Sequence, residues 1–142
     1  MISVSDTAIL YDADCGFCRV SVALVLSVDT RRRLRPVALQ DPEADRLLAE
    51  VPVRRRLDSW HLVLPGGEVR SAGAALAPLL ELLPGGGPAA RLSARLPDAA
   101  ERGYRWVAER RSAFGSSLPG AAKEWADDVI NRRTATRPSD PS

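Results

Sequence analysis

The chain has 142 residues, of which 45% are hydrophobic, and a formal net charge of +2. This size fits one domain with a substantial core, and so small a net charge does not indicate a nucleic-acid partner. No apolar run approaches the ~20 residues that span a bilayer, and residues 1–6 lack the basic and apolar segments of a secretory signal. We therefore expect a cytoplasmic protein with no membrane partner.

The first third of the chain predicts strand, helix, strand and helix. Residues 7–12 form a short apolar run that predicts a buried strand, and residues 15–29 are apolar without turn residues, which favours a helix. Residues 34–39 predict a second strand. The sequence Asp41-Pro42-Glu43 suits a helix start, since Asp can cap the first turn and Pro tolerates it, so we predict a helix to about Glu50.

The middle of the chain predicts a hairpin and a helix. Residues 60–64 and 68–71 read as strands joined by a Pro-Gly-Gly turn. Residues 74–83 predict a helix that ends in the Gly- and Pro-rich run 84–88. Beyond it, residues 89–97, 98–113 and 117–133 predict helices, and residues 134–142 are polar and Pro-rich. The order β-α-β-α-β-β-α predicts an α/β, thioredoxin-like fold, with a central four-stranded mixed sheet flanked by helices and additional C-terminal helices.

The most specific motif is Cys15-Gly16-Phe17-Cys18, which contains the only two cysteines of the chain. It follows the first predicted strand and opens the first predicted helix. On a helix, positions i and i+3 lie on one face, so the two sulfurs can meet. In a reducing compartment such a pair is typical of a redox or metal site rather than of a structural disulfide.

The segment Tyr11-Asp12-Ala13-Asp14-Cys15-Gly16-Phe17-Cys18 resembles the signature of the DCC family of thiol-disulfide oxidoreductases, with Ala13 in place of the usual Gly. Further similarities are Ala38-Leu39-Gln40, Ser59 to Val63, and Tyr104 to Ala108 with Phe114-Gly115. The resemblance covers roughly residues 7–115 and implies a thioredoxin-like fold. It predicts a domain over residues 1–115, a helical extension over 116–133 and a disordered tail over 134–142.

The motif predicts thiol–disulfide exchange without a cofactor. Cys15, at the helix start, would attack a disulfide as a thiolate, and Cys18 would resolve the mixed disulfide. The partner would be a disulfide-containing protein or a small thiol, with an unidentified electron donor. Asp14 is expected to cap the helix through its side chain. Asp12 is either a proton shuttle for Cys18 or a turn residue that binds backbone N–H groups.

Three further residues are candidate substrate contacts: Phe17, Ser59 and Trp60. Ser59 stands where thioredoxins place a cis-proline before the third strand, so it is expected to face the sulfurs. Packing is the alternative for Trp60. His61, the only histidine, is either a redox or ligand residue or a strand histidine with satisfied ring nitrogens.

Two other functions stay open at this point. A Cys-x-x-Cys pair can be half of a zinc site or a two-coordinate copper(I) site, which would make the chain a metal-binding or metal-delivery module. The sequence offers no second cysteine pair, and we predict no metal ligands. The chain could also be an accessory protein that keeps the fold without turnover, in which case its C-terminal helices could cover the motif or form a partner surface. A Cys15 sulfur buried under these helices would disfavour exchange.

Overall fold

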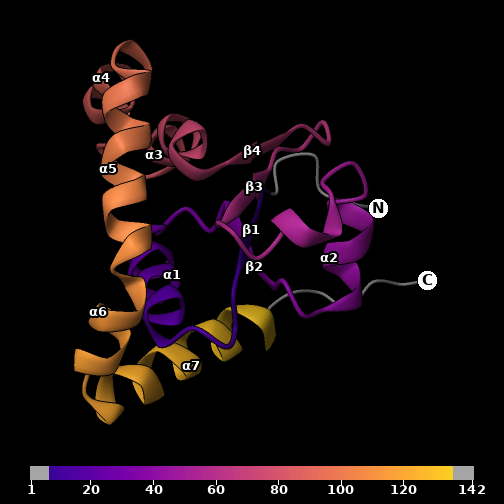
Figure 1. Cartoon of the computed structure of the whole chain (residues 1–142), viewed down its shortest axis with the longest axis vertical. Coiled ribbons are helices and arrows are strands. Elements are labelled where there is room, and N and C mark those ends of the chain that lie inside the picture. Colours follow the sequence, from indigo (N-terminus) through magenta and orange to yellow (C-terminus); the bar gives the residue numbers. More distant parts are fainter. Residues whose placement is uncertain (1–6, 136–142) are drawn as a thin grey trace.

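The computed structural model describes residues 7–135 and has a four-stranded mixed sheet at its centre (Figure 1). The strands are β1 (Thr7–Tyr11), β2 (Leu34–Ala38), β3 (His61–Val63) and β4 (Val69–Ser71), in the spatial order β2-β1-β3-β4. β1 pairs with β2 in parallel and with β3 in antiparallel, and β3 and β4 form an antiparallel hairpin. The predicted mixed sheet and α/β class are confirmed.

Alternating side chains of β1 divide the core between the two faces of the sheet, as strand geometry requires. Ile9 and Tyr11 pack with Leu62 against α1 (Gly16–Val28) and α3 (Leu76–Leu82). Ala8 and Leu10 point to the other face, where they pack with Ala44 and Leu48 of the α2 segment (Pro42–Leu47 and its C-cap). α1 and α2 therefore cover opposite faces.

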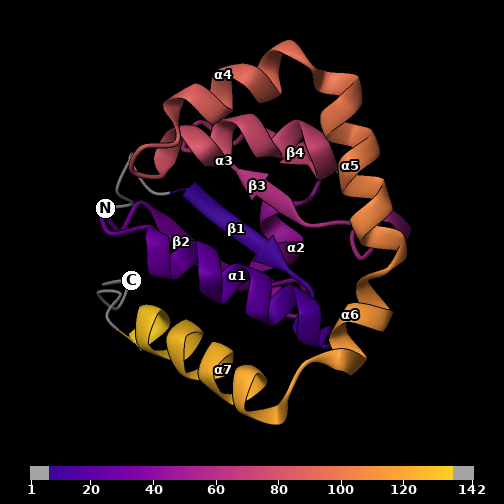
Figure 2. The same ribbon diagram turned by 90° about the vertical axis from the view of Figure 1, so that its left-hand side faces the viewer.

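A buried ion pair joins the end of α1 to the last helix, α7 (Gly120–Ala135). The carboxylate of Asp29 accepts hydrogen bonds from the backbone N–H groups of Arg33 and Leu34, and from Arg133 at 2.9 Å. α7 lies alongside α1 (Figure 2), and its residue Ile130 belongs to the same core as Ile9. α7, which follows the segment that resembles the family, is thus packed on α1, the helix that covers the sheet.

The chain between β4 and α7 runs around one side of the molecule (Figure 2). After η2 (Ala72–Ala75) and α3, it forms α4 (Gly87–Arg95), α5 (Pro97–Glu109) and α6 (Arg111–Ser117). α5 packs against η2 so closely that a Cβ at Gly73 would lie 2.7 Å from the Cα of Glu101. α6 packs against α1, so the chain returns to the Cys-x-x-Cys motif.

Several predicted boundaries differ from the structure. The predicted helix over 98–113 is two helices, α5 and α6, separated at Arg110. α2 ends at Leu47 rather than near Glu50, and a short 3-10 helix, η1 (Val53–Arg55), lies in the predicted loop.

The predicted disordered tail lies outside the described residues, apart from Thr134 and Ala135, which end α7. The division of the chain at residue 115 stays a prediction. Within residues 7–135, every helix is too short or too polar to cross a membrane.

Candidate active site

The two cysteines lie at the junction of β1 and α1, where Cys15 is the N-cap residue of the helix. The backbone N–H of Cys18 donates to the Sγ atom of Cys15 at 3.3 Å. Both residues are free thiols and partly exposed. The predicted cap at Asp14 is wrong, because the sulfur of Cys15 takes the position that a capping oxygen would occupy.

A hydrogen-bonded turn precedes the dithiol and contains both aspartates. The Oδ1 atom of Asp12 accepts from the backbone N–H of Asp14 at 3.0 Å and from Nε2 of Gln40 at 2.9 Å. Gln40 also donates to Oδ2 of Asp14 and accepts from the N–H of Ala13. Asp12 thus accepts the hydrogen bonds of the turn through Oδ1, and Gln40, which follows β2, holds the turn in place.

The two thiols have different environments. Burial, a hydrogen bond to Cys15 and the proximity of the Cys15 sulfur raise the pKa of the Cys18 thiol to about 12, from its ordinary value of 9.0. Arg111 opposes this shift, and the Asp12 carboxylate adds to it. Cys18 is therefore protonated at neutral pH and can donate a hydrogen bond to the sulfur of Cys15.

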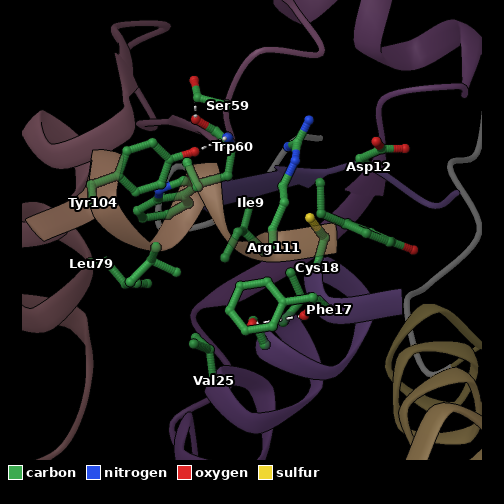
Figure 3. A pocket seen from close by; sticks show the side chains of 15 residues that line it. Ile9, Asp12, Phe17, Cys18, Val25, Ser59, Trp60, Leu79, Tyr104 and Arg111 are labelled. Atoms are coloured by element: carbon green, nitrogen blue, oxygen red, sulfur yellow. Dashed lines mark hydrogen bonds between the residues drawn. The ribbon is translucent and has the colours of Figure 1, made fainter. Parts of the chain in front are cut away.

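An apolar pocket of about 230 Å³ opens beside Cys18 (Figure 3). Its walls include aliphatic side chains from β1, α1, α3 and α5: Ile9, Val22, Val25, Leu79, Val107 and Ala108. The three predicted substrate contacts, Phe17, Ser59 and Trp60, all line it, and so does Asp12. Cys15 and Asp14 lie outside the lining, so Cys18 is the cysteine that faces the pocket.

Tyr104 of α5 closes the end of the pocket near β3. Its hydroxyl oxygen accepts a hydrogen bond from the backbone N–H of Trp60 at 3.4 Å, and burial raises the pKa of the phenol. Ser59 donates to the carbonyl oxygen of Trp60 at 3.2 Å. No cis peptide bond occurs between residues 7 and 135. Ser59 is thus brought to the dithiol side with a trans backbone.

Arg111, the first residue of α6, lines the same pocket and lies near both Cys18 and Tyr104. Sequence reasoning missed Arg111 as a site residue, and noted Tyr104 as part of the family similarity, not as a site residue. Both lie about a hundred positions from the motif, and neither belongs to a motif of its own. The only sequence signal is the family-like segment from Tyr104 to Ala108.

Aromatic contacts fix α6 over the start of α1. The rings of Phe17 and Phe114 are 5.5 Å apart, those of Phe114 and Trp106 are 6.2 Å apart, and the guanidinium of Arg110 stacks 4.3 Å from the Trp106 ring. Such contacts are favourable beyond the area that they bury. Phe17 therefore has a packing role in addition to lining the pocket.

Besides Arg111, two cations of α1 and α7 lie close to the motif in the structure. The side chain of Lys123 in α7 lies against Gly16, where a Cβ would approach Lys123 Cε to 2.8 Å. Arg19 points away from the dithiol and pairs with Asp127 of α7 at 3.1 Å. α7 thus contributes the lysine that the local sequence lacks.

His61 lies on the opposite face of the sheet from the dithiol. It is 2% exposed, and its ring nitrogens pair with Ser71 Oγ at 2.6 Å and the carbonyl oxygen of Arg56 at 2.8 Å. Burial lowers the pKa of the imidazole. Within residues 7–135, no three His, Cys, Asp or Glu side chains gather in a potential metal site. His61 is the strand histidine with satisfied nitrogens.

A model of the DCC1-like thiol-disulfide oxidoreductase family matches residues 9–116. No curated protein and no solved structure matches the chain significantly. The family match covers most of the chain and includes the last three residues of β1, the dithiol, the pocket and nearly all of α6. The chain therefore belongs to the DCC1-like thiol-disulfide oxidoreductase family, as its motif predicts.

Proposed function

We propose that this member of the DCC1-like family exchanges electrons with a disulfide through Cys15 and Cys18, with Cys15 as the attacking thiol. The observation that supports this most strongly is the asymmetry of the pair. Cys15 is partly exposed at a helix N-terminus, and Cys18 points its N–H group at the Cys15 sulfur. Backbone donors and the helix dipole favour negative charge at that position.

Exchange proceeds in two balanced steps. The Cys15 thiolate attacks one sulfur of the substrate disulfide, so that a Cys15–substrate bond forms and the substrate S–S bond breaks. The released thiolate takes up a proton. Cys18 then loses its proton and attacks Cys15 Sγ, so that the Cys15–Cys18 bond forms and the second thiol leaves. Two electrons pass from the protein to the substrate.

Asp12 is the proposed proton acceptor for Cys18. Both side chains line the pocket, and the high pKa of Cys18 means that its proton must be removed before the second step. A positioned base speeds such transfers by about 10²–10⁴. The Asp12 carboxylate accepts hydrogen bonds from the backbone N–H of Asp14 and from Gln40, and these bonds keep it in one orientation.

Two features favour exchange over the alternatives. Cys15 is partly exposed beside α6, whereas a purely structural site would bury it. Within residues 7–135, the two thiols have no third side chain beside them that completes a metal site, and His61 is on the other face and bonded at both ring nitrogens. We propose a reducing compartment such as the cytosol, in which a dithiol of this kind is regenerated by a disulfide reductant.

Cysteine variants test the proposal. The pre-reduced protein should reduce hydroxyethyl disulfide, a small model substrate, and Cys15→Ser should abolish the reaction. Cys18→Ser should accumulate a mixed disulfide at Cys15, visible as a mass increase. Ser27→Ala, on the same helix but far from the dithiol, is the control. Unchanged reduction in both cysteine variants would contradict the assignment.

The role of Asp12 has its own test. In Asp12→Asn, single-turnover kinetics at neutral pH should show a normal first thiol release and a second release slowed by about 10²-fold or more. The control is Asp14→Asn, which alters the same turn without changing the pocket lining. Equal slowing of both steps would show that Asp12 has only a structural effect.

A further inference from the structure

The half-buried residue Arg111 has an unusual environment. It lines a mostly apolar pocket, and its one hydrogen bond within residues 7–135 is donated by Nη2 to the carbonyl oxygen of Leu57 at 3.3 Å. None of the carboxylates in the described part of the chain lies within ion-pair distance of it. A cation next to apolar surface without a counter-ion favours an anionic ligand.

The rest of the pocket restricts that ligand to a compact apolar one. Aromatic rings of Phe17, Trp60 and Tyr104 line it together with the aliphatic side chains. Its volume of about 230 Å³ is below the roughly 300–1,000 Å³ of pockets for drug-sized molecules. A folded peptide segment is too large for this space, whereas a small aromatic or branched group fits it.

Polar groups of the pocket are arranged around Arg111 and Cys18. In Figure 3 Arg111 and Cys18 lie between Asp12 on one side and Tyr104 on the other. Asp12 is the one acidic side chain of the lining, and its Oδ1 is already bonded to Asp14 and Gln40. A ligand anion would therefore bind at Arg111 and away from Asp12.

We propose that this pocket binds one half of a small disulfide that combines a compact apolar body with a carboxylate or similar anionic group, and that Arg111 binds that group. This inference rests on the proposed exchange function and names its substrate class. Cys18 lines the pocket and hydrogen-bonds to Cys15. A ligand bound in the pocket with its sulfur next to Cys18 would therefore have that sulfur close to Cys15, the attacking thiol.

The chemistry of the step is the exchange described above. Cys15 attacks the ligand sulfur, the half outside the pocket leaves as a thiol, and the bound half stays attached to Cys15. Arg111 binds the anionic group of this half. Cys18 then loses its proton and attacks Cys15 Sγ, which displaces the bound half from Cys15. The second thiol then leaves, and the protein retains the Cys15–Cys18 disulfide.

A matched pair of probes tests the inference. One is the disulfide of meta-mercaptobenzoate and the other is the disulfide of meta-mercaptobenzamide, which differ in charge but hardly in shape. Single-turnover kcat/KM is measured with pre-reduced protein, and each rate is divided by the rate of the same probe with dithiothreitol. The wild type should prefer the acid by about ten- to a hundredfold, as for one charged hydrogen bond.

The variants identify the source of the preference. Arg111→Met should reduce the acid-to-amide ratio to about one, and Arg111→Lys should retain part of it. Arg102→Met removes an exposed arginine of α5 that is outside the pocket and should keep the wild-type ratio. A wild-type ratio near one, or a full preference in Arg111→Met, would overturn the inference.

A binding measurement separates this inference from the proposed function. Calorimetry with Cys15→Ser should show tighter binding of meta-(methylthio)benzoate, which cannot exchange, than of its amide, and Arg111→Met should abolish the difference. Reduction of hydroxyethyl disulfide without any acid preference in rates or binding overturns the inference alone. If the wild type reduces none of the three disulfides, the proposed function fails and the inference falls with it.

Discussion

The β1–α1 junction and the α5–α6 corner meet at one pocket and contribute different things to it. The junction supplies the Cys18 thiol and the Asp12 carboxylate to the pocket lining and places Cys15 beside it, all within seven consecutive residues. The corner supplies Tyr104 and Arg111, which line the same pocket as Cys18 although they lie far from it in the sequence. The two thiols are thus encoded locally, whereas the groups that we propose to select a substrate depend on long-range packing. Substitutions at the helix contacts that hold the two regions in place therefore test how strongly these contacts affect stability and the site.

The largest effect is expected at the ion pair between Asp29 and Arg133. The Asp29 side chain is 0% exposed and that of Arg133 14%, so Asp29→Ala removes a fully buried carboxylate that pairs with a mostly buried guanidinium. We expect a loss of about 3–5 kcal/mol in the free energy of unfolding, measured by urea denaturation. The control Asp128→Ala breaks an exposed pair with Arg132 and should cost less than about 1 kcal/mol. Equal losses would mean that the buried pair does not couple α7 to α1.

A smaller effect is expected where α5 contacts η2. In Gly73→Ala the new Cβ would lie within 2.8 Å of the backbone of Glu101, so α5 must move. Overpacking of this kind costs about 1–3 kcal/mol, and it should also weaken probe binding at Tyr104. Gly103→Ala is the matched control on α5, since its Cβ would meet nothing within 4 Å. That control should stabilise the helix by about 1 kcal/mol. A neutral Gly73→Ala would show that α5 can shift freely.

Phe114→Ala removes the ring contact between α6 and the motif itself. The contact with Phe17 at 5.5 Å predicts a loss of about 0.5–1.5 kcal/mol, seen in thermal unfolding. Alkylation of Cys15 by iodoacetamide should become faster, because α6 no longer packs firmly on the helix start. Leu92→Ala, at an exposed residue of α4, should leave the alkylation rate unchanged. Unaltered alkylation in Phe114→Ala would show that α6 does not restrict access.

The smallest effect at neutral pH concerns Cys18. Because its pKa is raised from 9.0 to about 12 in the folded protein, the unfolded state loses the proton first. Below pH 9.0 the thiol is protonated in both states and its contribution to stability is fully present; it declines as the pH rises from 9.0 towards 12. Reduced wild type should therefore lose stability in this range more steeply than Cys18→Ala in urea titrations. Parallel curves would contradict the pKa shift.

The parts of the fold that follow from local pattern could be predicted from the sequence. The apolar run at residues 7–12, the Asp41-Pro42 helix start and the Pro-Gly-Gly turn each have a physical signature that acts within a few residues. The dithiol belongs to this class, since its spacing and its position after a strand place one cysteine at the helix N-cap and the other in the first turn. This is why the sheet and the family could be recognised together.

Other features depend on geometry that no local pattern encodes. The break between α5 and α6 occurs at Arg110 without a glycine or proline, where the guanidinium stacks on Trp106. The Asp14 cap was wrong because Asp and Cys are adjacent, and only the backbone angles decide which side chain caps the helix. The positions of Arg111 and Lys123 depend on where α6 and α7 return to α1, which the sequence does not state.

The side chain of Gln40 has a consequence for how the turn before the dithiol can be followed experimentally. It accepts one hydrogen bond and donates two. A glutamate at this position would place a third carboxylate next to those of Asp12 and Asp14, and an asparagine side chain would be one carbon too short to make the same bonds. The NH₂ group of Gln40 contains two inequivalent protons, each directed at a different aspartate. In a ¹⁵N-labelled sample, the NMR chemical shifts of this side-chain amide should therefore report on the turn, and we expect them to change when Cys15 and Cys18 are oxidised.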